Sequence, residues 1–229
     1  MSELGTSPRD GGPTQKRYRP PVLVALLLLV AIVAGLTIAL TGSSKRAALP
    51  GGVQQSGPAS GFFGTLAIPA KQAPAIRLRN YMGQPVSLDR YRGKAVLVTF
   101  LYTHCPDVCP LITSNLRVAL NQLGPRAGQA QVIAISVDPA GDTPSAVASF
   151  LRAHEMLGRM QYLIGSPAAL SRAWAAWSVG SSREVGQPDR VAHSALIYGI
   201  TGTGRLQTLY PASFDPAEIV HDVPRLAAR

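Results

Sequence analysis

The sequence contains very little cysteine, and this scarcity excludes one class of protein. Only two cysteines occur among 229 residues, too few for a small domain held together by several disulfide bonds. Charged residues make up only 15% of the chain and hydrophobic residues 46%, so the chain is not disordered over most of its length. No internal repeat is visible. The length therefore fits one globular domain with additional segments.

The chain also lacks the charge pattern of a nucleic-acid-binding protein, although its formal net charge is +10. Its positive charges are mostly isolated arginines, without a basic run interleaved with aromatic residues. We therefore predict no nucleic-acid partner. The arginines Arg77, Arg79, Arg90 and Arg92 are expected on an exposed face. Either an acidic lipid or an acidic protein would suit such a face.

One long apolar run lies near the N-terminus. Residues 22–40 are nineteen consecutive uncharged, mostly apolar positions, and about 20 such residues cross a bilayer as a helix. The apolar core of a cleaved signal is shorter, roughly 7–15 residues, and no convincing cleavage pattern follows this run. These features favour an uncleaved anchor over a removed signal. Four basic residues precede the run and two follow it, which orients the N-terminus toward the cytoplasm.

These features divide the chain into four predicted segments. They are a cytoplasmic tail at 1–20, a transmembrane anchor at 21–41, a flexible linker at 42–74 and a globular domain at 75–229. The linker contains several Gly, Ser and Pro residues and has no apolar periodicity. The domain is expected on the extracytoplasmic side of the plasma membrane, joined to it by a single pass. Whether Phe62 and Phe63 dock on this domain is left open.

Strand-like and helix-like stretches alternate within the domain. A short hairpin is expected around Gly83, and the Trp174 and Trp177 pair is expected in the core. The remaining predicted elements are strands at 95–102, 131–137, 162–164, 194–200 and 205–210, and helices at 108–123, 143–154, 167–177 and from 215 onward. Strands interleaved with helices indicate an α/β fold, with a mostly parallel central sheet covered on both faces.

Both cysteines lie in one loop between a predicted strand and a predicted helix, with the sequence YTHCPDVCP at residues 102–110. Free N–H groups and the positive dipole end of a helix N-terminus favour thiolate over thiol. Cys105 and Cys109 are spaced i, i+4, so their sulfurs can converge on one ion or join each other. The flanking prolines and the loop position argue against two ordinary buried cysteines in a core. A purely structural disulfide would close a loop too short to constrain the unfolded chain much.

This loop resembles the signature of the Sco/SenC family of copper-binding proteins. Three further segments also resemble that family: SVDP at 136–139, DTP at 142–144 and GK at 93–94. The likeness covers roughly residues 75–222. It implies a thioredoxin-like fold with an N-terminal β-hairpin extension, preceded by one transmembrane helix. It further implies that two cysteines and a distant histidine bind copper, as Cu(I) or Cu(II), for assembly of the dinuclear copper centre of cytochrome c oxidase.

Four histidines are candidates for that third ligand. His154 and His221 are expected at the surface. His104 precedes the first cysteine, and His193 precedes a strand expected to lie beside the strand that leads into the cysteine loop. Geometry alone leaves His104 and His193 open. The resemblance assigns the ligand to His193.

The residue before His193 departs from the family pattern. Many members have an acidic residue there, where this chain has Ala192. Metal-binding histidines are usually oriented by a hydrogen-bonding partner. Asp107 and Asp189 are the candidates for that role.

The ligand set favours a copper carrier. Two thiolates and one imidazole suit copper, whereas structural zinc sites usually have four protein ligands. Three ligands leave an open side for transfer to the copper-bearing subunit of cytochrome c oxidase or to another acceptor. A disulfide between Cys105 and Cys109 would abolish binding, so the redox state would gate loading. A thiol reductant is therefore an expected partner.

The alternative is a thiol–disulfide oxidoreductase or thiol peroxidase on the same fold. Redox proteins of the thioredoxin type have two residues between their cysteines, whereas this chain has three. They also carry a proline where this chain has His193, and the nearest proline here is Pro188. Reduction of cysteines in the oxidase subunit itself remains open, as does a non-enzymatic interaction domain.

Overall fold

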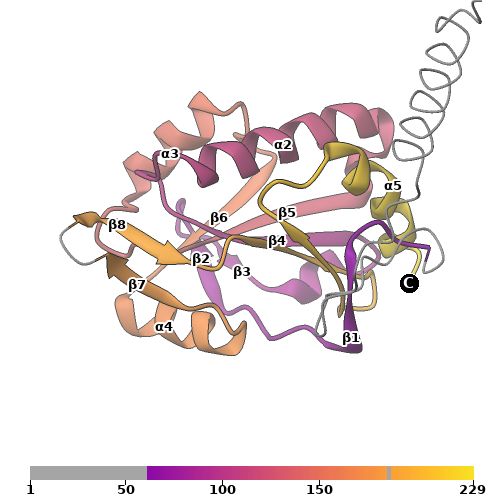
Figure 1. Ribbon diagram of the computed structural model, residues 1–229, viewed down its shortest axis with the longest axis horizontal. Helices are drawn as coiled ribbons and strands as arrows, with labels where there is room; N and C mark the ends of the chain where they lie inside the picture. Colours follow the sequence, from indigo (N-terminus) through magenta and orange to yellow (C-terminus); the bar gives the residue numbers. More distant parts are fainter. Residues whose placement is uncertain (1–60, 185–186) are drawn as a thin grey trace, which may run out of the picture. The chain divides into compact units, whose positions relative to one another are not determined.

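The computed structural model describes residues 61–184 and 187–229 (Figure 1). The predicted tail at 1–20, the predicted anchor at 21–41 and the linker up to residue 60 lie outside the described residues. Within the described ranges, no helix is long and apolar enough to cross a membrane.

A single large sheet forms the centre of the described domain, in the strand order β1-β10-β9-β4-β5-β6-β2-β3. Its strands are β1 (Thr65–Gln72), β2 (Leu78–Asn80), β3 (Pro85–Val86), β4 (Ala95–Leu101), β5 (Ala130–Ser136), β6 (Met160–Ile164), β9 (Leu196–Ile200) and β10 (Arg205–Pro211). β4 lies in the middle and is buried at every position. The strand that leads into the cysteine loop is therefore fixed by neighbours on both sides.

Helices cover both faces of this sheet, with α2 and α5 on one face and α4 on the other (Figure 1). Their bounds are α2 (Val108–Leu123), α3 (Pro144–Ala153), α4 (Pro167–Ala176) and α5 (Pro216–Ala227), with 3-10 turns at Leu88–Tyr91 and Gly124–Gln129. Thr143, Ser166 and Asp215 each cap a helix by accepting a backbone N–H, and each is followed by proline in the first turn.

The prediction of a mostly parallel sheet is wrong. Only β4, β5 and β6 run parallel in the described sheet, because α2 and α3 carry the chain back across it between these strands. β9 pairs antiparallel with β4 and with β10. β9 and β10 are joined by a turn at Gly204, where φ is +83°, and β2 and β3 by a turn at Gly83, where φ is +81°. Strands joined by such short turns pair antiparallel.

The N-terminal hairpin is confirmed as β2 and β3, and it extends the sheet beyond β6. Two features differ from the expectation. β1 lies within the segment 42–74 that was assigned to the linker, and it pairs with β10, so the folded domain begins before residue 75. A separate two-stranded sheet, β7 (Ser181–Glu184) with β8 (Gln187–His193), was not predicted.

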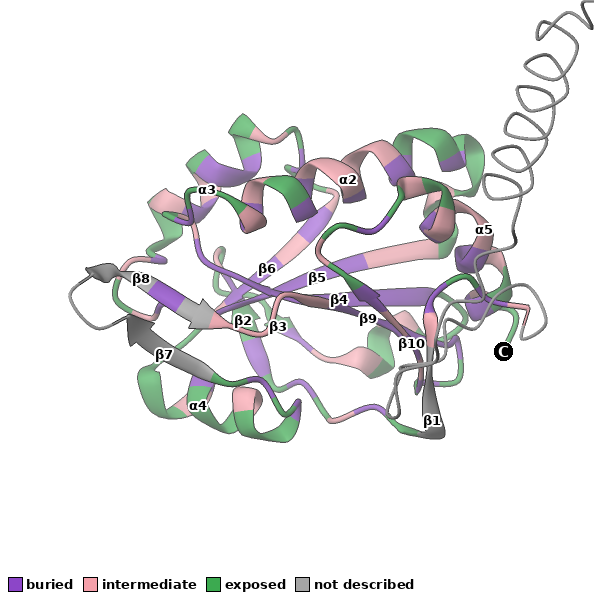
Figure 2. Ribbon diagram, viewed as in Figure 1, coloured by how far each residue is buried: buried purple, intermediate pink, exposed green. Residues whose placement is uncertain are grey.

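The core lies between the sheet and the helices (Figure 2). Trp177 is buried against Phe100 and Tyr198. The indole Nε1 of Trp174 donates a hydrogen bond of 2.9 Å to the carbonyl of Ser136. Trp177 therefore lies in the core, as predicted, and Trp174 is half-buried against it.

The first described residues are tied to the last helix. The backbone N–H groups of Phe63 and Gly64 donate to the carboxylate of Asp222 on α5, at 3.0 Å and 2.9 Å. Asp222 is fully buried and also accepts a hydrogen bond of 2.7 Å from the hydroxyl of Tyr210. Phe62 is fully buried as well, so the segment before β1 docks on the domain.

Candidate metal centre

The two cysteines lie where β4 ends and α2 begins. Cys109 is in the first turn of α2, and Asp107 caps this helix by accepting the N–H of Val108. Both cysteines are buried free thiols. The N–H of Cys109 lies 3.4 Å from the sulfur of Cys105 and donates to it. The loop therefore brings the two sulfur-bearing residues together at a helix N-terminus, as the sequence predicts.

The pKa values of the two thiols are shifted in opposite directions. A hydrogen bond from the Cys109 thiol, supported by the N–H groups of Asp107 and Cys109, lowers the pKa of Cys105 to about 6 against the effect of burial. The same hydrogen bond, together with burial, raises the pKa of Cys109. At neutral pH the loop therefore holds one thiolate, at Cys105, and one thiol, at Cys109. The thiolate is the form that binds metals and attacks disulfides.

His193 is placed beside this pair. It ends β8, and its Nε2 lies 4.0 Å from the sulfur of Cys109. Its Nδ1 lies 3.2 Å from the carbonyl oxygen of Ser194. Because a carbonyl can only accept, Nδ1 carries the proton and Nε2 keeps its lone pair. Burial lowers the pKa of His193, which keeps the imidazole in the neutral form that a ligand needs.

Tyr102 connects the cysteine loop to the strand that carries His193. Its hydroxyl oxygen accepts the N–H of Val191 at 3.4 Å, and its ring meets the imidazole of His193 edge-on, with the centroids 6.0 Å apart. Burial raises the pKa of Tyr102 to about 12, so the phenol stays neutral. Since β8 belongs to the small two-stranded sheet, this contact helps to set the position of His193 relative to the cysteines.

Asp142 supports the loop from the interior. One of its carboxylate oxygens accepts the N–H of Thr103 at 2.8 Å. The other accepts the hydroxyls of Ser136 at 2.6 Å and Tyr162 at 2.9 Å. Burial raises the pKa of Asp142. This carboxylate joins the carboxyl ends of β4 and β5 to β6, directly before the cysteine loop.

The gap between Cys109 and His193 allows a test of fit for one metal ion. Metal–sulfur and metal–nitrogen bonds of about 2.3 Å and 2.0 Å, as for zinc, sum to about 4.3 Å. The observed separation of 4.0 Å thus admits one ion bound by both atoms in a bent arrangement. Among the described residues, no three His, Cys, Asp or Glu side chains are already grouped closely enough to hold a metal ion. The candidates lie near one another without yet converging on one point.

The other three histidines make different contacts. His104 is exposed, with its Nδ1 3.1 Å from the hydroxyl of Thr103. His154 follows the last residue of α3, and its ring packs against that of Phe150 at an interplanar angle of 53°. His221 lies on α5, with its Nδ1 2.7 Å from the carboxylate of Asp222. The structure therefore places His193, rather than His104, against a cysteine.

Among the described groups, the hydrogen-bonding partner of His193 Nδ1 is the carbonyl of Ser194. Asp107 is exposed, and its Oδ1 lies 3.8 Å from the sulfur of Cys105. It therefore contacts the cysteine loop. The side chain of Asp189 lies outside the described part of the chain. The role predicted for Asp189 therefore stays a prediction. A backbone carbonyl cannot be identified from residue types, because every residue has one. Tyr102 and Asp142 belong to the sequence motifs described above, but no role could be assigned to them from the sequence.

Comparison with known proteins identifies the family. The SCO1/SenC family model matches residues 69–228. The mitochondrial SCO2 homologue of Mus musculus is 31% identical over 153 residues, which cover 65% of this chain and 59% of that protein. The aligned region is therefore less than two thirds of that relative's length.

Two solved structures share the fold. Apo Sco1 of Thermus thermophilus superposes with a TM-score of 0.62 at 32% identity, covering 72% of this chain and 96% of that one. ScoI of Bradyrhizobium japonicum, solved with copper bound, gives 0.61 at 29% identity, covering 68% and 99%. These neighbours and the mixed sheet fit the expected thioredoxin-like fold. Because the family model covers more than half of the chain, this protein belongs to the SCO1/SenC family.

Proposed function

We propose that this protein is a copper carrier for assembly of the dinuclear copper centre of cytochrome c oxidase. The observation that carries the proposal is the arrangement of Cys105, Cys109 and His193: a thiolate beside a thiol, with an imidazole lone pair 4.0 Å from the second sulfur. The copper-bound ScoI of Bradyrhizobium japonicum, a family relative, supports copper as the ion. The predicted anchor at 21–41 would hold the domain at the outer face of the plasma membrane.

The residues divide the work of carrying copper. Cys105 offers its thiolate as the first ligand, and Cys109 loses its proton as it binds, because metals bind cysteine as thiolate. His193 offers Nε2, held in the correct tautomer by the Ser194 carbonyl. Two thiolates suit Cu(I), and adding the imidazole also accommodates Cu(II). With three protein ligands, one side stays open to a ligand from the copper-bearing oxidase subunit or another acceptor.

Copper titration of the reduced full chain in a non-ionic detergent tests this proposal. A coloured Cu(I) chelator competes for the metal. We expect near-stoichiometric uptake by the wild type, loss of uptake in Cys105→Ser and Cys109→Ser, and at least about tenfold weaker binding in His193→Ala. His104→Ala is the matched control and should bind like the wild type. Unchanged uptake in both cysteine variants would overturn the proposal.

The low pKa of Cys105 supports thiol–disulfide exchange as a second candidate. The Cys105 thiolate would attack a disulfide of the partner and form a mixed disulfide, and Cys109 would then displace the partner's second thiol. The dithiol loses two electrons, the partner gains them, and a thiol reductant must regenerate the pair. Reduction of a model disulfide peptide distinguishes the two roles. His193→Ala should spare peptide reduction, whereas it should weaken copper binding.

A further inference from the structure

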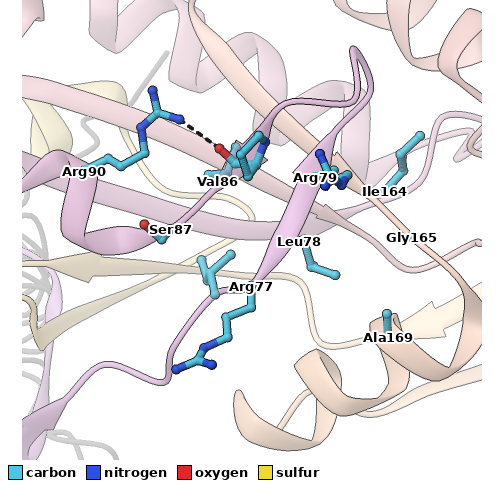
Figure 3. A pocket seen from close by; sticks show the side chains of 11 residues that line it. Arg77, Leu78, Arg79, Val86, Ser87, Arg90, Ile164, Gly165 and Ala169 are labelled. Carbon is cyan, nitrogen blue, oxygen red and sulfur yellow. Dashed lines mark hydrogen bonds between the residues drawn. The ribbon is translucent and has the colours of Figure 1, made fainter.

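A groove lies at the hairpin edge of the sheet, between β2, β3 and the start of α4 (Figure 3). Its volume is about 620 Å³, within the range of about 300–1,000 Å³ that is typical of ligand sites. The buried side chains of Leu78 and Val86 and the half-buried Ile164 line it. A hollow of about 270 Å³ adjoins it along α4. The groove therefore has an apolar floor that is open to solvent.

Basic side chains surround this floor. Arg77, Arg79 and Arg90 line the groove (Figure 3), and Arg172 lines the adjoining hollow. All four are exposed, and no acidic residue is among the described residues that line either space. Asp89, next to Arg90 in the sequence, forms its ion pair with Arg92 at 2.9 Å. The groove therefore presents positive charge above an apolar surface.

Two of the guanidinium groups are already held in place. Nη1 of Arg79 donates to the carbonyl of Gly83 at 2.6 Å, and Nη1 of Arg90 donates to the carbonyl of Pro85 at 2.9 Å. A guanidinium has five N–H donors, so each keeps several for a carboxylate. Because these side chains are already held, binding of an anion costs less side-chain conformational entropy than it would at an unrestrained arginine.

We propose that this groove binds an acidic, partly apolar peptide segment of a partner protein. Carboxylates of the segment would pair with the arginines, and an apolar side chain would cover Leu78 and Val86. Addition of the segment as a further strand is disfavoured, because Pro85 has no N–H and its carbonyl already accepts from Arg90. Recognition therefore depends on side chains.

The position of the groove favours a protein over a lipid surface. β3 and β1 are the opposite edges of the sheet, and seven strand spacings of about 4.8 Å separate them by roughly 34 Å. The described chain begins at the β1 edge, directly before Thr65. The groove thus lies far from the point where the preceding chain joins the domain. A flat lipid surface would also leave its recessed floor unfilled.

The groove lies within reach of a partner that contacts the cysteine loop. The carboxyl end of β6 borders the groove at Ile164 and Gly165, and the parallel strand β4, which leads into the loop, is two strands away. That separation is about 10 Å across the sheet, and an ordinary interface covers about 800 Å² on each partner. The proposal does not rest on copper transport, because none of the groove residues belongs to the metal centre.

Fluorescence anisotropy with a labelled peptide of alternating Glu and Leu tests the proposal on the full chain in a non-ionic detergent. We expect the wild type to bind, and added salt to weaken binding. The triple variant Arg77→Gln/Arg79→Gln/Arg90→Gln should bind at least about tenfold more weakly, since one exposed charge pair accounts for up to about fivefold. If this variant is misfolded by circular dichroism, Arg77→Glu alone replaces it; because this change turns an attraction into a repulsion, about fivefold weaker binding is expected.

A matched control removes the same charge elsewhere. The variant Arg126→Gln/Arg152→Gln/Arg225→Gln changes three exposed arginines outside the groove and should bind the peptide like the wild type. A peptide with Gln in place of Glu should not bind. The proposal is overturned if the wild type does not bind the peptide, or if both triple variants weaken binding equally. It is also overturned if soluble dihexanoyl phosphatidylglycerol binds the groove more tightly than the peptide does. Copper uptake by the groove variants should equal that of the wild type, so a failed copper role would be seen separately.

Discussion

Replacing Asp142 by alanine should destabilise the domain strongly. The carboxylate is 3% exposed and accepts three hydrogen bonds, from the N–H of Thr103 and the hydroxyls of Ser136 and Tyr162. A hydrogen bond to a charged group contributes about 1.5–3 kcal/mol, and a buried donor left without a partner costs about 1–3 kcal/mol. The two hydroxyls can rotate toward other acceptors, whereas the Thr103 N–H is fixed. We therefore expect a loss of about 3–5 kcal/mol of unfolding free energy, compared with a typical total of about 5–15 kcal/mol.

Urea unfolding followed by tryptophan fluorescence measures this loss. With a slope of about 1–3 kcal/mol per molar urea, the midpoint should fall by about 2 M. Ser136→Ala and Tyr162→Phe are the matched controls, because each removes one donor and leaves the carboxylate its other hydrogen bonds. Each should cost about 1.5–3 kcal/mol, the contribution of one hydrogen bond to a charged group. An Asp142→Ala protein within about 1 kcal/mol of the wild type would refute the reasoning, as would a Ser136→Ala protein that is equally destabilised.

Two other perturbations test the thiol pair and the buried carboxylate of α5. Ultraviolet absorbance of the reduced protein should show a thiolate forming with a midpoint near pH 6 and persisting above it. Cys109→Ala should raise this midpoint because it removes the hydrogen bond to Cys105, and a wild-type midpoint near the ordinary value of about 8.5 would contradict the assignment. Asp222→Ala should cost about 3–4 kcal/mol in urea unfolding, because the N–H groups of Phe63 and Gly64 lose their acceptor. An unchanged urea midpoint in Asp222→Ala would show that the hydrogen bonds to Asp222 do not hold the segment before β1 on the domain.

The helices were the most predictable part of the fold. α2 spans the range given by its apolar period, which ends at Gly124. α3 begins after Thr143, whose hydroxyl accepts the N–H of Ala146 at 3.2 Å. In both cases the signal is local, since a helix forms its backbone hydrogen bonds within one segment and its caps come from neighbouring residues.

Strand pairing was less predictable because it depends on distant segments. β8 has the sequence QPDRVAH, in which no alternation of apolar and polar residues marks a strand, and its pairing with β7 is made by the backbone. β1 contains Pro69 and was assigned to the linker, although it lies against β10 more than 130 residues later. Alternation of strands and helices identifies the parallel unit β4-β5-β6 and says little about the edges, whose directions follow from short turns.

The candidate metal centre was likewise predictable only in part from the sequence. Spacing alone brought Cys105 and Cys109 together, whereas the choice of His193 over His104 needed the family resemblance. The Ser194 carbonyl that orients His193 could not be found from the sequence, because every residue has a carbonyl. The hydrogen bond from Tyr162 to Asp142 joins positions that are twenty residues apart, on elements whose contact only the fold creates.

The attachment of the first described residues to Asp222 has a mechanical consequence. Any pull on the chain before residue 61 first meets the two hydrogen bonds to Asp222 and then the antiparallel ladder between β1 and β10. A load along a strand in such a ladder is shared by all of its hydrogen bonds. Since β10 and β9 stand between β1 and β4, tension that travels through the sheet crosses three strand interfaces before it reaches the cysteine loop. The sheet thereby distributes a pull on the preceding chain over many hydrogen bonds before it reaches the two sulfurs and the imidazole.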